Sequence, residues 1–191
     1  MAGALSYNVV EAALAIWAGT EADSIALLGF GLDSLIEIAA AAVLLWRLLI
    51  ELRGGESGSI EKAERRARLF IGATFLALAV YVVVQSVVDL VLTHRPGESL
   101  LGIGLAAASL AIMPLVSWGK FRVAARLESG ALRAEAKETL ACAYLSFALL
   151  VGLLLNATLD WWWADPVVAL AMVPWLVWEG IEGVKGESED D

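Results

Sequence analysis

The sequence is poor in the side chains on which most enzymes and many metal proteins depend. Among 191 residues it has one cysteine, Cys142, and one histidine, His94. A single cysteine excludes an intramolecular disulfide. A single histidine excludes an HExxH zinc motif, and no nucleophile–base arrangement or catalytic aspartate pair has a suitable spacing. The sequence therefore predicts that the protein is not an enzyme.

Charged residues are also scarce. They make up 18% of the chain against 60% hydrophobic residues, and the mean hydropathy is +0.75. These values lie outside the usual range of a soluble globular domain and predict an all-α integral membrane protein whose main partner is the lipid bilayer. The net charge of −9 argues against a nucleic-acid partner.

Six apolar segments are long enough to cross a bilayer, so the expected fold is a six-transmembrane-helix bundle. The predicted spans cover about residues 1–19, 24–50, 69–92, 100–118, 130–156 and 161–178. Together they form one transmembrane domain, residues 1–184, followed by a short acidic tail, residues 185–191. The first span is interpreted as a shortened helix, which leaves open whether the amino terminus is complete.

The distribution of basic residues predicts the orientation of these spans. Arg95 is the one basic loop residue on one side of the predicted membrane. Basic loop residues concentrate on cytoplasmic sides, so both termini are expected in the cytoplasm of a multi-pass protein. The basic residues on that side are Arg53, Lys62, Arg65, Arg66, Arg68, Lys120, Arg122, Arg126 and Lys185.

Residues 24–37, with the sequence SIALLGFGLDSLIE, place two acids inside an apolar segment. An ionised carboxylate in the middle of a bilayer costs about 2.5–3.5 kcal/mol by insertion scales. Asp33 and Glu37 are four residues apart, so they lie on one helix face about one turn from each other. Two adjacent carboxylates repel each other unless a cation or proton lies between them. The pair is therefore a candidate site for a divalent metal ion.

A second stretch repeats the pattern 105 residues downstream. Residues 129–142, SGALRAEAKETLAC, align without a gap against residues 24–37, which matches Glu138 with Asp33 and Cys142 with Glu37. The two copies fall on the second and fifth predicted spans, which cross the membrane in opposite directions. This is typical of an inverted repeat, in which both pairs meet near the midplane.

These motifs resemble the cation diffusion facilitator, or cation efflux, family of divalent-metal transporters. The resemblance rests on FGLDSLIE at residues 30–37, on ALRAEAKETLAC at 131–142 and on WADP at 163–166. Within the family, the sequence most specifically resembles the short bacterial members that lack the carboxyl-terminal cytoplasmic domain. It implies six helices in the bacterial cytoplasmic membrane, and metal export from the cytoplasm in exchange for protons.

The resemblance also implies a tetrahedral metal site with two ligands from each of the second and fifth helices. Carried over, these ligands are Asp33, Glu37, Glu138 and Cys142. The thiol favours Zn²⁺ over harder ions, so zinc is the expected transport substrate, with cobalt, iron and cadmium left open, and no permanently bound cofactor is expected. Three carboxylates around one divalent ion leave a surplus negative charge, which fits proton binding when the metal leaves.

Other roles for these residues stay open at this stage. Glu138 can pair with Lys137 or Arg133 on its own helix, and a buried Cys142 can act as a small apolar side chain. Further acids in or beside the spans are candidates for a proton relay or an alternative ligand: Glu135, Glu11 and Asp89. Asp165, before Pro166, is predicted to cap its own helix.

Two further points of function are left open. Acidic pairs in a membrane can also form a cation-selective channel, or belong to a partner protein that transports nothing. A homodimer would need contacts within the membrane, for which the fourth span offers small residues. These are Gly102, Gly104, Ala106, Ala107 and Ala108.

Overall fold

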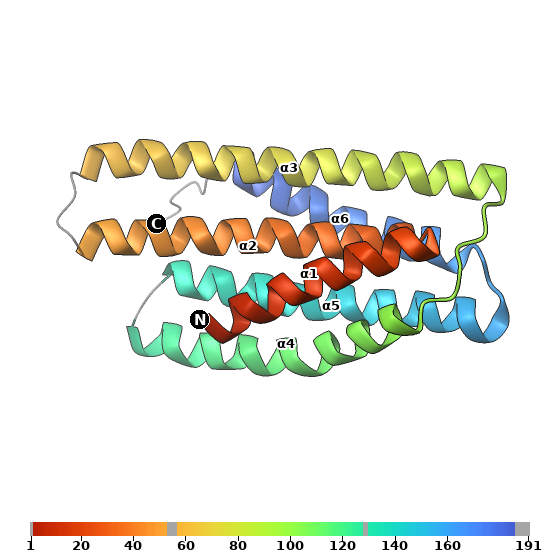
Figure 1. Cartoon of the computed structure of the whole chain (residues 1–191). Coiled ribbons are helices and arrows are strands. Elements are labelled where there is room, and N and C mark those ends of the chain that lie inside the picture. The colour runs from red at the N-terminus through yellow and green to blue at the C-terminus, as the bar shows by residue number, and fades with distance from the viewer. Residues whose placement is uncertain (1, 53–56, 128–129, 186–191) are drawn as a thin grey trace.

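The computed structural model describes the backbone of residues 2–52, 57–127 and 130–185, and side chains at 5–43, 45–46, 49, 65, 69–126, 136–137 and 139–185. This part of the chain is all helical (Figure 1). Its six helices are α1 (Ala2–Ala22), α2 (Ile25–Leu52), α3 (Ser57–Leu92), α4 (Leu100–Leu127), α5 (Gly130–Leu159) and α6 (Ala164–Lys185). The predicted six-helix, all-α architecture is confirmed, while residues 186–191 of the predicted tail lie outside the described residues.

Five of the six described helices are long and apolar enough to cross a membrane. The helix that does not meet this criterion is α1, which carries the polar side chains of Asn8 and Glu11 in its first half. Both side chains are buried inside the bundle. The polar residues that lower the hydropathy of α1 are therefore turned away from the lipid-facing surface.

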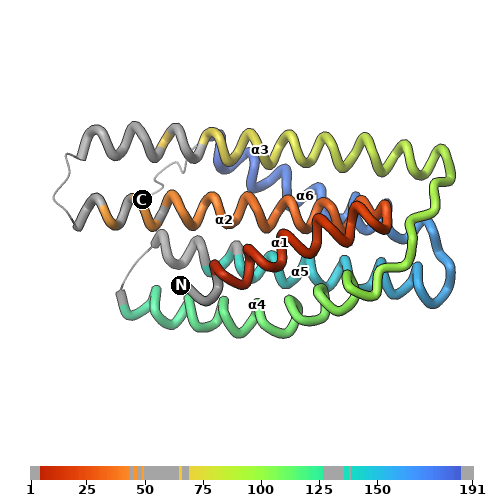
Figure 2. Tube along the Cα trace, in the orientation of Figure 1, coloured from red at the N-terminus to blue at the C-terminus, as the bar shows by residue number. Residues whose placement is uncertain are grey.

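The helices form two groups. α1, α2, α4 and α5 pack against one another, while α3 packs mainly along α6. Figure 2 shows α1 running obliquely across the bundle from the side of α4 to the start of α2. α2 and α5 contact each other and run in opposite directions, as an inverted repeat requires (Figure 1). The core between them includes Phe30, Leu145 and Leu149, all fully buried.

Two helices extend beyond the apolar segments that were predicted to span the membrane. α3 begins at Ser57 and α4 continues to Leu127, so residues 57–68 and 119–127, which lie outside the predicted spans, are helical. The stretch 60–68, IEKAERRAR, consists mostly of strong helix formers and has no proline. Local propensity therefore favours a helix in this stretch. A hydropathy pattern does not predict it, because the stretch has no apolar face.

The three turns at the end of the bundle where α1, α3 and α5 finish share one backbone feature, a residue with a positive φ directly after the helix. Asp23, Thr93 and Asp160 each follow a helix and adopt a positive φ, of 49°, 54° and 52°. This left-handed conformation ends a helix within one residue, and aspartate tolerates it better than most residues do. The Gly97 amide donates to the carbonyl of Ala22 at 2.7 Å, which joins two of these turns.

The small residues of α4 do not form one exposed face. Gly102 contacts Leu27 and Leu153 inside the subunit, and Ala106 is fully buried. Gly104 and Ala107 are exposed. A helix turns the small residues that the sequence offered for a homodimer contact to different sides, and the homodimer itself stays a prediction.

Glycine lets α3 and α6 approach each other closely. A Cβ atom added at Gly72 would lie 2.8 Å from the carbonyl oxygen of Gly180 and 2.8 Å from the amide nitrogen of Val184. Both are backbone atoms, which cannot rotate away as a side chain does. Small residues at such positions are what allows two membrane helices to make close backbone contact.

Substitution of Gly72 by valine is expected to destabilise the protein by about 1–3 kcal/mol, because α3 and α6 must separate to admit the side chain. The measurement is thermal unfolding of the purified protein in detergent. Gly104→Val is the matched control, since a Cβ atom there meets nothing within 4 Å. Equal stability of the two variants would contradict the close-packing argument.

Candidate functional site

Asp33 and Glu37 lie on the face of α2 that turns toward the interior of the four-helix group. Asp33 is 7% exposed, and Glu37 is half-buried. The side-chain amide of Asn8, on α1, donates a hydrogen bond from Nδ2 to Glu37 Oε2 at 3.0 Å. The pair predicted from its i, i+4 spacing is therefore inside the bundle, and α1 holds one member of it.

Glu11 brings a third carboxylate into the same region from α1. It is 1% exposed, and the Ser109 hydroxyl of α4 donates to its Oε1. The Tyr7 hydroxyl lies 2.8 Å from Ser109 Oγ and is the donor there, since the single proton of Ser109 points to Glu11. Ser34 Oγ is 3.4 Å from Glu11 Oε2. Glu11 is thus held by hydroxyl groups from α2 and α4.

Cys142 provides the contribution of α5. The thiol is free and 2% exposed. It lies close enough to Glu37, Glu11 and Asp33 to interact with their carboxylates electrostatically. The structure therefore brings together, in one buried polar region, three of the four residues that the resemblance implies as metal ligands, with Glu11 beside them.

The fourth residue, Glu138, lies on α5 one helical turn before Cys142. Its side chain, like that of Glu135, is outside the part of the chain whose side chains are described. Among the described residues, no group of three or more His, Cys, Asp or Glu side chains is arranged to hold a metal ion. The four-ligand set therefore stays a prediction, although three of its members share one region.

Asp89 belongs to a different part of the molecule. It is buried near the end of α3, where its Oδ1 lies 3.7 Å from His94 Nδ1. Its electrostatic partners there include Asp23 and Asp165. Asp33, in contrast, lies about 12 Å along α2 from the start of that helix, at 1.5 Å per residue. The structure separates Asp89 from the polar region around Cys142.

Asp165 does not cap its own helix, so that prediction is wrong. α6 begins one residue earlier, at Ala164. The Asp165 carboxylate instead accepts hydrogen bonds from the Ser24 hydroxyl and from the Ala26 amide at 3.3 Å. It therefore caps α2, because the unpaired amide groups at the start of that helix lie within its reach.

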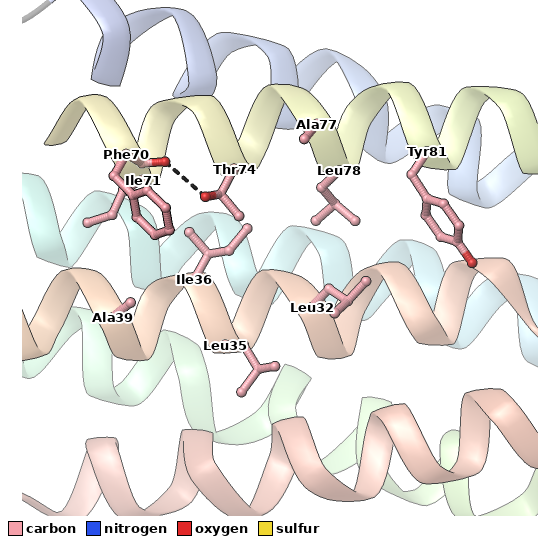
Figure 3. Close-up of a pocket in the computed structure, with 10 residues that line it drawn as sticks. All are labelled: Leu32, Leu35, Ile36, Ala39, Phe70, Ile71, Thr74, Ala77, Leu78 and Tyr81. Carbon is pink, nitrogen blue, oxygen red and sulfur yellow. Dashed lines mark hydrogen bonds between the residues drawn. The ribbon is translucent and has the colours of Figure 1, made fainter. Parts of the chain in front are cut away.

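A groove of about 430 Å³ lies between α2 and α3. Figure 3 shows Leu32 and Ile36 of α2 facing Phe70 and Leu78 of α3. The hydroxyl of Thr74, also in the lining, donates to the carbonyl of Phe70 at 2.8 Å. The residues that line the groove are uncharged, so it offers no charged ligand to a cation. The polar region is on the other side of α2, toward α1 and α5.

Several members of the polar region were not identified from the sequence. Ser34, Tyr7 and Ser109 carry no motif of their own, and their roles appear only when α1, α2 and α4 come together. Lys120 is a similar case: it lies on α4, and its Nζ donates to Thr139 Oγ1 of α5 at 2.8 Å. The one available signal was the presence of Asn8 and Glu11 in an otherwise apolar segment.

Two comparisons bear on what this arrangement does. Residues 2–182 match the family described as the cation efflux transmembrane domain. An uncharacterized transporter from Synechocystis sp. is 32% identical over 161 residues, which cover 82% of this chain. The match covers 52% of that relative, so the chain spans about half of its length.

Proposed function

Because the chain belongs to the cation efflux family, as its match over residues 2–182 shows, we propose that it exports a divalent metal cation, with zinc as its main substrate, in exchange for protons. Membership of a transport family confirms the resemblance found in the sequence and the prediction that the protein is not an enzyme. The metal, the proton coupling and the direction of transport are the proposed parts.

The observation that carries this proposal is the meeting of α2 and α5 in one buried polar region. Asp33 and Glu37 are carboxylates from one helix, and Cys142 is a thiol from the other, within electrostatic reach of both. Buried charges in a membrane are costly and are associated with ion pathways. We propose that these three residues and Glu138 bind the transported ion during part of the cycle.

The chemistry of the donor set supports zinc. Thiolate ligands favour softer, tetrahedral cations, and zinc accepts sulfur and carboxylate oxygen in the same site. Magnesium and manganese are matched better by oxygen ligands alone. The buried Cys142 is the residue that distinguishes these cases, so a preference for zinc over manganese follows from its role as a ligand.

The same donor set supports exchange with protons. Carboxylates and a thiol must lose their protons to bind a metal, so protons and metal compete for one set of atoms. The metal would be released on the side opposite the termini, and protons would then bind the carboxylates. The site could return toward the cytoplasm with its surplus negative charge neutralised. The basic residues of the predicted cytoplasmic side support an orientation in which metal enters from there.

The proposal is tested in proteoliposomes that contain the purified chain and an internal pH indicator. Zinc movement accompanied by proton movement in the opposite direction is expected. Zinc flux without proton movement, at a rate that does not saturate, would favour a channel. If zinc does not move, the same assay with manganese, cobalt and cadmium separates a wrong metal from a wrong function.

The affinity for zinc is expected to decrease as the pH is lowered. Each proton displaced on metal binding contributes roughly a tenfold loss of affinity per pH unit below the ligand's own pKa. Titration of the native protein with zinc in detergent at a series of pH values measures this slope. An affinity that does not change with pH would contradict direct competition between protons and metal.

A further inference from the structure

Asn8 has a buried side-chain oxygen without a hydrogen-bond partner, one of two such side-chain atoms in the described part of the chain. The residue is 8% exposed, and its Nδ2 donates to Glu37 Oε2 at 3.0 Å. Its Oδ1 is buried and has no hydrogen-bond partner. The amide orientation is set by its neighbour, because an ionised carboxylate accepts hydrogen bonds and only the nitrogen of the amide can donate one.

Such an oxygen is unfavourable unless something binds it. Leaving a buried acceptor unpaired costs about 1–3 kcal/mol, and most buried polar atoms in folded proteins have a partner. The cost arises here beside Glu37, a residue of the proposed transport site, and not in the apolar core. An amide oxygen is also a good ligand for hard and borderline divalent cations.

We propose that Asn8 is a cation-binding residue of the transport site and that its Oδ1 supplies an oxygen ligand from α1. Its Nδ2 orients the Glu37 carboxylate at the same time, so one amide group serves both the metal and one of its anionic ligands. This inference rests on the proposed function and extends the site from two helices to three.

The proposal has a consequence for selectivity that a purely structural role lacks. An amide oxygen contributes more to the binding of a hard ion such as Mn²⁺ than to that of a soft ion such as Cd²⁺, for which the sulfur of Cys142 is the stronger ligand. Loss of Oδ1 should therefore weaken Mn²⁺ binding more than Cd²⁺ binding. Loss of packing alone would weaken both to a similar extent.

The test is calorimetric titration of the full chain in detergent with Mn²⁺ and with Cd²⁺. For Asn8→Leu, which keeps the approximate volume and removes both polar atoms, we expect about a 10–100-fold loss of Mn²⁺ affinity and a clearly smaller loss for Cd²⁺. Asn8→Asp keeps an oxygen and loses the donor, so it should retain most of the Mn²⁺ affinity. Retained Cd²⁺ binding also shows that the variants are folded.

Ser86→Ala is the matched control. Ser86 Oγ is also buried and without a hydrogen-bond partner, but it lies on α3, outside the polar region. Its removal should leave the ratio of Mn²⁺ to Cd²⁺ affinity unchanged. The inference is overturned if Asn8→Leu changes both affinities equally or changes neither. If the native chain transports zinc in proteoliposomes but binds neither Mn²⁺ nor Cd²⁺, this inference fails and the proposed function stands. If it transports none of zinc, manganese, cobalt and cadmium, both fail.

Discussion

Replacement of Asp33 by asparagine is expected to abolish metal transport while leaving the protein folded. The two side chains have nearly the same size, so the change removes a charge from a buried position, 7% exposed, without opening a cavity. Loss of a group that only orients a metal ligand costs roughly 10–100-fold in affinity or activity. Loss of a charged ligand should cost at least about 100-fold. Zinc flux into proteoliposomes measures the effect.

Asp160→Asn is the control for the loss of one negative charge. Its side chain is 83% exposed and lies 3.5 Å from Arg95 at the end of the bundle, so zinc flux should stay at the native level. If Asp33→Asn transports zinc within about twofold of the native rate, metal transport does not depend on this carboxylate. A twofold loss is much smaller than the loss caused by removing a group that only orients a ligand.

Glu138→Gln extends the test to α5. If flux is lost in both variants, the site is built on α2 and α5, as the match between residues 24–37 and 129–142 implies. If flux persists in Glu138→Gln and not in Asp33→Asn, the repeat argument is wrong. The metal would then be held by α2 with other partners. Glu11 of α1 is a candidate, since it is buried and interacts electrostatically with Cys142.

The helices were predictable because apolar runs of this length have few alternatives in a bilayer. The extent of α3 was not, since its first residues are charged helix formers whose propensity leaves no trace in hydropathy. Part of the site was also predictable. The spacing of Asp33 and Glu37 put them on one face, and the echo downstream pointed to Cys142, which lies within electrostatic reach of both carboxylates.

What the sequence did not reveal depends on how helices approach each other. The hydrogen bond from Asn8 to Glu37 joins residues 29 positions apart, and the one from Ser109 to Glu11 joins residues 98 apart. Periodicity assigns each residue to a face of its own helix but contains no information on the register between helices. The same limit explains Asp165. Its local pattern indicated a cap on its own helix, whereas its carboxylate binds the start of α2.

Replacement of Asp165 by alanine is expected to destabilise the protein by about 2–5 kcal/mol. The carboxylate is 1% exposed and accepts hydrogen bonds from the Ser24 hydroxyl and the Ala26 amide. Alanine would leave these donors buried and unpaired, at about 1–3 kcal/mol each. It would also remove an N-terminal cap from α2, the helix that carries Asp33. Thermal or denaturant unfolding in detergent measures the loss.

Two variants separate the cap from the charge. Asp165→Asn keeps one acceptor oxygen for the start of α2 and should lose less stability than Asp165→Ala, because one of the two donors retains its partner. Asp160→Asn removes an exposed carboxylate from the turn before α6 and keeps a side chain that tolerates the positive φ of this residue, so it should leave stability unchanged, since exposed ion pairs contribute little. If Asp165→Ala is as stable as Asp160→Asn, the contacts of Asp165 do not hold α2 in place. The position of Asp33 in the bundle must then be fixed by the packing of α2 against α1 and α5 alone.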